Sequence, residues 1–100
     1  MTEQSRSIDL AYAAGIIDGE GCIGTYFNSH QHTHQLRITV EMVDDSALQH
    51  LKKLFGGRFY YKAAKPPRKA RHIWMVFNSR AETTLKELLP FLKVKTPQAL

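Results

Sequence analysis

The chain of 100 residues contains a single cysteine, Cys22, and no apolar run long enough to cross a membrane. One cysteine excludes an intrachain disulfide, and the polar N-terminus has no signal-peptide pattern, so we expect an intracellular rather than a secreted protein. Without a stretch of about 20 apolar residues, no transmembrane helix and no membrane partner are expected. The length allows one compact domain, which we expect to occupy residues 1–100.

Acidic residues are also scarce, because 9 aspartates and glutamates stand against 14 lysines and arginines, which leaves a formal net charge of +5. The sequence pI is near 9.6. A basic domain of this kind favours a polyanionic partner. The charge alone is weak evidence for nucleic-acid binding, because many small basic proteins bind no nucleic acid.

The spacing of apolar residues predicts an α+β protein with the element order α-β-β-α-β-β-α. The expected helices cover residues 8–18, about 45–55 and 81–92, and the expected strands cover 22–29, 36–43, 58–64 and 72–77. Residues 93–100 would begin a fourth helix that the chain hardly enters. We expect a four-stranded antiparallel sheet with the helices on one face, which leaves the other face free to bind a partner.

The first predicted helix carries small residues at every fourth position, namely Ala11, Gly15 and Gly19. Small residues on one helix face allow close approach of a second helix. Glycine inside a helix costs about 1 kcal/mol relative to alanine, so Gly15 indicates a steric requirement. Two interpretations stay open: tight packing against the rest of the same domain, or packing against another helix.

Two carboxylates, Asp18 and Glu20, stand at the end of this helix, separated and followed by glycines. Acids are unfavourable at the negative end of the helix dipole, whereas a bound divalent cation would reverse that effect. Carboxylate oxygens are ligands that magnesium prefers, and the glycines would allow a phosphate backbone to come close. The alternative is a solvated acidic turn without a ligand.

Residues 13–21, with the sequence AAGIIDGEG, resemble the nine-residue motif of the LAGLIDADG homing endonuclease family. Ala13 replaces the usual leading leucine, and Gly19 and Glu20 replace alanine and aspartate. The element order that follows the motif is similar to that of the family as well. The resemblance covers almost the whole α-β-β-α-β-β-α unit.

This resemblance implies roles for the motif residues. Glu20, with Gly19 beside it, would bind the catalytic Mg²⁺ (or Mn²⁺) near the scissile phosphate, and Asp18 would be mainly structural. A chain with one motif would have to dimerise, so a homodimer is expected. Its interface would contain Ala11, Gly15, Asp18 and Gly19.

The C-terminal segment 89–100 resembles the family's segment after the third helix, which leads to a basic residue near the cleavage centre. Lys95 matches that residue by position, and its ammonium group would polarise the attacking water or stabilise the pentavalent phosphate. The alternative is an ordinary lysine near a helix end. Family domains usually continue through more helix, so the C-terminal helical tail is expected to be short or missing.

Alternation of side chains in the first two strands separates a core face from an exposed face. Ile23, Phe27, Ile38, Val40 and Met42 fit the core. The exposed face would then carry possible DNA-reading residues, namely Tyr26, Asn28, Gln35, Arg37, Thr39 and Glu41. Arginine and glutamine can each bind base edges in the major groove through two hydrogen bonds.

The second pair of strands is less clearly patterned. If Phe59 and Tyr61 point inward, Tyr60 and Lys62 point outward. By analogy with the family, His72 and Trp74 would face DNA; the alternative is that Trp74 belongs to the core and the register is reversed. The basic residues of this hairpin and its connection are candidates for phosphate contacts: Lys62, Lys65, Arg68, Lys69 and Arg71.

Histidines at positions 30, 32 and 34 occupy the connection between the first two strands. The family resemblance implies that this tip enters a DNA groove, so His30 and His32 are candidate DNA contacts. A solvated loop and a structural zinc site are alternatives. No finger-like cluster of further ligands accompanies the histidines, which argues against zinc.

Two positions differ from the pattern of homodimeric family members. Asp44 stands where some of them carry a glutamine that helps to order active-site water, and Leu48 stands where they carry an arginine. The expected function is site-specific, Mg²⁺-dependent cleavage of double-stranded DNA at a long pseudo-palindromic site by an intron-encoded type of nuclease. The alternative is a weakly active or inactive relative that binds RNA or DNA as a maturase or regulator.

Overall fold

The chain begins with a helix that is longer than the sequence predicts. The structure, a computed structural model, describes residues 3–30 and 32–93. Helix α1 spans Glu3–Glu20, whereas its start was expected at Ile8. The additional turn contains no glycine or proline, and Arg6 forms an ion pair with Glu87 of α3. Because this pair ties the early part of α1 to another helix, the helix continues through its polar N-terminal residues.

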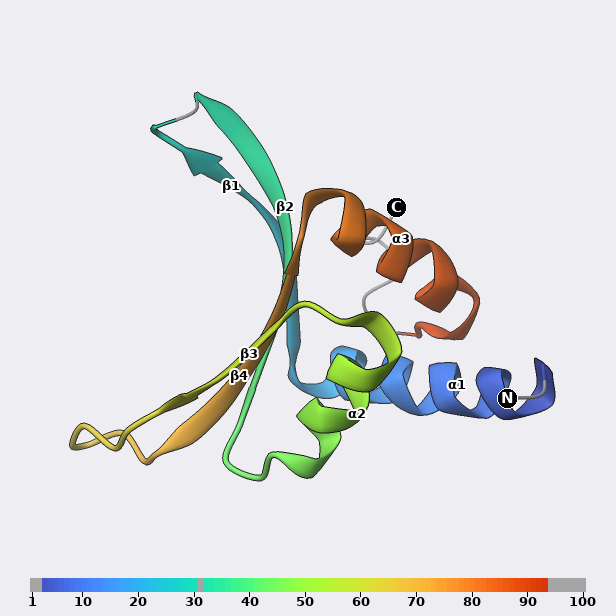
Figure 1. Ribbon diagram of the computed structural model, residues 1–100, viewed down its shortest axis with the longest axis horizontal. Coiled ribbons are helices and arrows are strands. Elements are labelled where there is room, and N and C mark those ends of the chain that lie inside the picture. The colour runs from blue at the N-terminus through green and yellow to red at the C-terminus, as the bar shows by residue number, and fades with distance from the viewer. Residues whose placement is uncertain (1–2, 31, 94–100) are drawn as a thin grey trace.

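The predicted order α-β-β-α-β-β-α is confirmed (Figure 1). After α1 come β1 (Gly21–Asn28), β2 (Thr33–Met42), α2 (Ser46–Phe55), β3 (Arg58–Lys62), β4 (Arg71–Phe77), α3 (Asn78–Leu88) and a 3₁₀ turn (Leu89–Phe91). The strands form one antiparallel sheet in the order β1-β2-β4-β3. The third helix ends earlier than expected, because Pro90 lacks the N–H group that an α-helix needs.

All helices lie on the same side of the sheet, and its other face is uncovered (Figure 1). The β1–β2 and β3–β4 hairpins both extend beyond the helices and bend away from them, so the uncovered face is concave. We call it the open face. No helix in the described part of the chain is long and apolar enough to cross a membrane.

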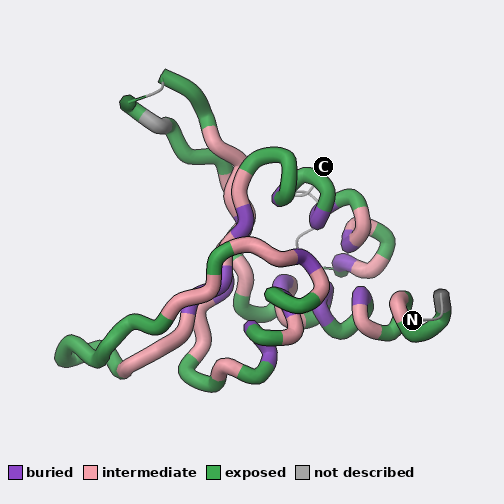
Figure 2. The backbone as a smooth tube through the Cα atoms, viewed as in Figure 1, coloured by how far each residue is buried: buried purple, intermediate pink, exposed green. Residues whose placement is uncertain are grey.

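The core lies between the helices and the covered face of the sheet, and the hairpin tips are exposed (Figure 2). Ile17 of α1, Ile38 of β2 and Leu51 of α2 are each fully buried there. Ile38 pairs with Val76 across the β2–β4 ladder, and Val40 pairs with Trp74. The covered face is therefore built from alternate residues of the central strands, and the residues between them occupy the open face.

The outward orientation predicted for His72 and Trp74 is wrong, because both lie on the covered face. Trp74 has no exposed surface, and its indole Nε1 donates a hydrogen bond to the Gly56 carbonyl at 2.8 Å. That bond satisfies the polar group of a buried tryptophan. His72 lies at the margin of the covered face, where its Nδ1 is 3.3 Å from the Val43 carbonyl oxygen.

Replacing the buried indole should weaken folding rather than DNA binding. In Trp74→Phe the Gly56 carbonyl loses its donor and the core loses volume, so we expect a loss of about 2 kcal/mol in the free energy of unfolding. Urea unfolding measures this, with Tyr61→Phe, at an exposed ring, as the matched control. Unchanged stability together with weaker DNA binding would contradict the buried role.

Candidate functional site

The open face carries most of the residues predicted to read DNA. Tyr26 pairs with Gln35 and Gly24 with Arg37 across the β1–β2 ladder. The structure thus places Tyr26, Gln35, Arg37, Thr39 and Glu41 on the open face, as alternation predicted. Asn28 ends β1 opposite Thr33. Polar side chains from adjacent strands therefore form one continuous surface.

Arg37 is held at the centre of this surface by two aromatic rings. Its guanidinium carbon lies 4.2 Å from the centroid of the Tyr26 ring and 5.2 Å from that of the Phe77 ring. Such cation–π contacts orient the guanidinium without neutralising its charge. The Arg37 Nε is buried and has no hydrogen-bond partner within the described structure. The group is thus pre-oriented and keeps donors for a ligand.

Glu41 holds two of the predicted phosphate-contacting arginines. Its carboxylate accepts a hydrogen bond from Arg71 Nε at 2.8 Å and lies 3.7 Å from Arg68 Nη2. The bond from Arg71 is the main reason why the pKa of Glu41 is lowered from its ordinary value of 4.5. Glu41 is therefore ionised at neutral pH. It partly offsets the positive charge of the surface and restrains Arg71, whose side chain is only 12% exposed.

Neutralising Glu41 should increase affinity for duplex DNA. Glu41→Gln removes a negative charge from the open face and releases Arg68 and Arg71 for phosphate contacts, so we expect binding of non-specific duplex to strengthen several-fold at low salt. Fluorescence anisotropy across a salt series measures the change. Glu82→Gln, on the exposed side of α3, is the control; an equal gain there, or weaker binding by Glu41→Gln, would contradict this role.

The basic connection between β3 and β4 forms the tip of its hairpin. Lys62 ends β3, and Lys65 and Arg68 close a turn through two backbone hydrogen bonds. Lys62, Lys65 and Lys69 are exposed. Since the tip bends toward the side of the open face (Figure 1), these lysines remain candidates for contacts with DNA phosphates.

The histidines at the other hairpin tip do not form a metal site in the structure. Within the described ranges no three histidine, cysteine, aspartate or glutamate side chains are grouped so that they could hold a metal ion. The rings of His32 and His34 lie 6.4 and 5.4 Å from that of Phe27. His30 lies in the turn and is exposed. His32 and His34 thus contact the Phe27 ring and do not form part of a zinc site in the described structure.

Sequence reasoning left some residues of the open face out of the candidate set. Tyr60, which was predicted to point outward but not named as a DNA contact, shares the face with Lys62, and Arg58 lies on the same face by alternation. Reversing the register of β4 also places Ile73, Met75 and Phe77 on the open face. The open face therefore also carries apolar and aromatic side chains of β4 beside the polar residues of β2.

The motif helix buries one face and exposes the other. Ala13, Ala14 and Ile17 have no exposed surface. The opposite face shows Ala11, Gly15 and Gly19, together with Ile8 and Tyr12, which are 63% and 54% exposed. We call these five residues the α1 stripe.

No contact within residues 3–30 and 32–93 explains Gly15 and Gly19 of the α1 stripe. A Cβ atom added at Gly15 or Gly19 would meet no atom within 4 Å. At Gly21, by contrast, it would lie 2.8 Å from the Ile17 carbonyl oxygen, so that glycine is needed where α1 turns into β1. Packing against the described part of the domain therefore does not account for Gly15, and packing against another helix stays a prediction.

The two acids at the end of α1 have different environments. Asp18 Oδ2 accepts a hydrogen bond from the Lys93 backbone N–H at 2.7 Å, which ties the segment after α3 to the end of α1. Glu20 is exposed at the last position of the helix. Asp18 thus has the structural role expected of it, and Glu20 is left accessible. Lys95, the second predicted catalytic residue, lies outside the described residues.

The donor atoms around Glu20 suit a hard divalent cation. A carboxylate and the backbone carbonyls of Gly19 and its neighbours are oxygen donors, and magnesium usually binds proteins through one or two carboxylates while keeping several waters. One chain supplies a single accessible carboxylate here, because Asp18 is engaged with Lys93. A second accessible carboxylate would have to come from another molecule.

The two positions that depart from the family pattern have structural roles. Asp44 Oδ1 accepts the backbone N–H of Ser46 at 2.8 Å, and this bond is the main reason for the lowered pKa of Asp44. Leu48 is fully buried in the core. Leu48, being buried, cannot contact a substrate, whereas Asp44 is exposed.

The fold of the chain is similar to that of several solved structures. No protein-family model matches the sequence, and no curated protein is significantly similar to it. The homing endonuclease I-CvuI, in complex with its target and in the presence of Ca, is similar over 97% of this chain and 64% of its own, with 24% identity and a TM-score of 0.80. The archaeal intron-encoded homing endonuclease I-Vdi141I, complexed with DNA, matches 94% of this chain and 64% of its own at 20% identity and a TM-score of 0.69.

A third similar structure is the LAGLIDADG meganuclease I-AabMI bound to uncleaved DNA, at 18% identity and a TM-score of 0.63. It covers 84% of this chain and 30% of its own length. The chain thus spans less than two thirds of each of these nucleases. At these identities the likeness establishes the architecture, and the chain has the fold of the LAGLIDADG homing endonucleases.

Proposed function

We propose that the chain is one subunit of a homodimeric, metal-dependent endonuclease that cuts double-stranded DNA at a specific site. The observation that carries the proposal is the end of α1, where an accessible acid, Glu20, follows a helix face whose glycines are not covered by any described residue. Similar structures were solved with DNA, and one of them with Ca. In this proposal the protein acts inside the cell, where its DNA target lies.

The open face would bind in the major groove. Arg37, pre-oriented by Tyr26 and Phe77, is suited to bind the edge of a guanine through two hydrogen bonds. Gln35 and Thr39 offer further donors and acceptors beside it. The lysines at the β3–β4 tip would contact phosphates, which contribute affinity rather than sequence specificity.

The α1 stripe would pack against the same stripe of a second subunit. A two-fold dimer uses the same surface on both partners, so Gly15 and Gly19 of each helix would allow both backbones to approach closely. The exposed Ile8 and Tyr12 would be removed from water in the same contact. Two equivalent open faces would then read a pseudo-palindromic DNA site.

In the dimer Glu20 of each subunit would hold Mg²⁺ (or Mn²⁺), assisted by the Gly19 carbonyl. The cation, when bound, supplies charge neutralisation at the scissile phosphate and lowers the pKa of a bound water. Asp18, through its bond to the Lys93 N–H, holds Lys93 beside the end of α1. The Lys95 ammonium would stabilise the negative charge that develops on the phosphate.

Incubation of a supercoiled plasmid library with the protein, with and without Mg²⁺, tests the proposal. We expect linear or nicked products from a plasmid that carries the target site, only when Mg²⁺ is present. A second candidate function is DNA binding without cleavage, which the structural roles of Asp44 and the buried Leu48 favour. Sequence-selective binding without strand cleavage under any metal condition would establish that second function.

A further inference from the structure

Three basic side chains surround a cavity at the turn between α2 and β3. The cavity has a volume of about 520 Å³. Lys52 of α2, Arg58 of β3 and Arg80 of α3 line it, together with the turn glycines Gly56 and Gly57. The cations come from three separate elements, and the lining contains no acidic residue. We call Lys52, Arg58 and Arg80 the turn cluster.

The charges of the turn cluster are not neutralised within the described structure. No ion pair there involves any of the three residues. Lys52 Nζ donates to the Gly57 carbonyl, and Arg80 Nη1 donates to the Phe55 carbonyl at 3.0 Å. Both acceptors are neutral carbonyl groups, so the positive charge is only oriented by these bonds.

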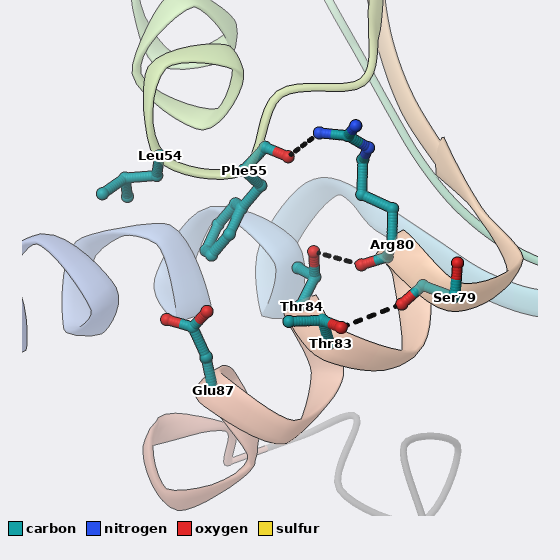
Figure 3. A pocket seen from close by; sticks show the side chains of 7 residues that line it. All are labelled: Leu54, Phe55, Ser79, Arg80, Thr83, Thr84 and Glu87. Carbon is teal, nitrogen blue, oxygen red and sulfur yellow. Dashed lines mark hydrogen bonds between the residues drawn. The ribbon is translucent and has the colours of Figure 1, made fainter.

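Arg80 lines this cavity and also a second one of about 420 Å³, which Figure 3 shows. Figure 3 shows one Nη of its guanidinium directed to the Phe55 carbonyl. A Cβ atom at Gly56 would collide with that nitrogen. The glycine turn therefore makes room for the guanidinium, whose remaining N–H groups are available to a ligand.

Capping of α2 accounts for only part of the turn cluster. Cations near the C-terminus of a helix are favourable, and Lys52 and Arg80 both bind carbonyls at the end of α2. Arg58, however, is exposed, and its guanidinium lies 5.8 Å from the Tyr60 ring rather than at the helix end. A third positive charge beside the other two is unfavourable unless an anion binds.

The position of the turn cluster in the sheet indicates which kind of anion it would bind. Arg58 begins β3, an outer strand of the sheet, and its side chain shares the open face with Tyr60. The outer strands of a four-stranded sheet lie ~14 Å apart, whereas the major groove is ~12 Å wide. A sheet placed in the groove therefore brings its outer strand to the phosphates that border the groove.

We infer that the turn cluster binds a backbone phosphate of duplex DNA at the β3 edge of the open face. The inference rests on the proposed function, because it takes the open face to be the DNA-binding surface. It assigns Lys52, Arg58 and Arg80 a role in affinity and positioning, outside the residues that read bases or bind metal. The α2–β3 turn thereby becomes part of the DNA interface.

Charge-neutralising variants test this assignment through the salt dependence of binding. Each phosphate contact contributes about 0.9 to the slope of log affinity against log salt, which is about a 3.5-fold change in affinity between 50 and 200 mM salt. We expect Arg58→Gln to lower the slope by about 0.9, and Lys52→Gln with Arg58→Gln to lower it by no more than this amount, because the cluster binds one phosphate. Lys53→Gln is the matched control, because Lys53 is the next residue of α2 and lines a different hollow with Arg6 and Asp9.

The outcomes separate this inference from the proposed function. If the unmodified protein does not bind duplex DNA, the proposed function fails and the inference fails with it. If it binds DNA and the Arg58 variants have the same slope as Lys53→Gln, only the inference is overturned. Titration with inorganic phosphate at constant ionic strength, followed by NMR, adds a second test. Phosphate binding could be saturable and lost in Arg58→Gln while the salt dependence of DNA binding stays unchanged. That result would assign the cluster to a free anion and overturn the DNA contact.

Discussion

Glu20→Gln is expected to abolish DNA cleavage and to leave DNA binding within about twofold of the unmodified protein. The amide keeps the size of the side chain but loses the charge that holds a divalent cation. Loss of about 4 kcal/mol of transition-state stabilisation corresponds to a rate reduction of about a thousandfold. Because Glu20 is exposed at the end of α1, the fold should be unaffected. Cleavage of a labelled target duplex and anisotropy binding under the same conditions measure the two effects.

Two further variants make this result specific. Glu82→Gln removes an equal charge from an exposed position on α3 that pairs with Lys86, and it should cleave normally. Asp18→Asn should lower stability, because the carboxylate that accepts the Lys93 N–H is lost. Retained cleavage in Glu20→Gln, or loss of binding together with cleavage, would refute the role assigned to Glu20.

Gly15→Leu is expected to convert the dimer into a folded monomer that no longer cuts both strands. A Cβ atom at this position would meet no described atom within 4 Å, so we expect the subunit to keep its fold. A leucine in the α1 stripe would hold two helices apart, and the close contact that glycine permits would be lost. Light scattering coupled to size-exclusion chromatography measures the mass, and we expect it to halve.

A smaller substitution at the same position has opposite effects on the subunit and the dimer. Gly15→Ala should stabilise the isolated subunit by up to about 1 kcal/mol, because alanine is the better helix former, while it weakens association. Lys86→Leu, which also adds an exposed leucine to a helix, is the control and should stay dimeric. An unmodified protein that is monomeric at all concentrations, or a dimeric Gly15→Leu, would rule out the α1 stripe as the interface.

The end of the motif helix and the two faces of the first hairpin were predictable from the sequence, although Phe27, predicted to lie in the core, is exposed. In β1 and β2 apolar residues alternate with polar ones, because one face packs on the helices and the other meets solvent, and this alternation specifies the register. Glycines at 56 and 57 have φ values of 71° and 91°, which few other residues adopt, so the end of α2 was also evident. The order of elements and most of the open face follow from these local patterns.

The orientation of β4 and the partners of the charged residues were decided only by the tertiary structure. Residues 73–77 are apolar on both faces, so alternation cannot orient the strand. Trp74 faces the core because the α2–β3 turn brings the Gly56 carbonyl to its indole N–H. Likewise, the pairing of Glu41 with Arg71 and of Asp18 with Lys93 joins residues that are distant in sequence. Residue types and their local spacing are present in the sequence, whereas which distant groups meet depends on how the elements pack.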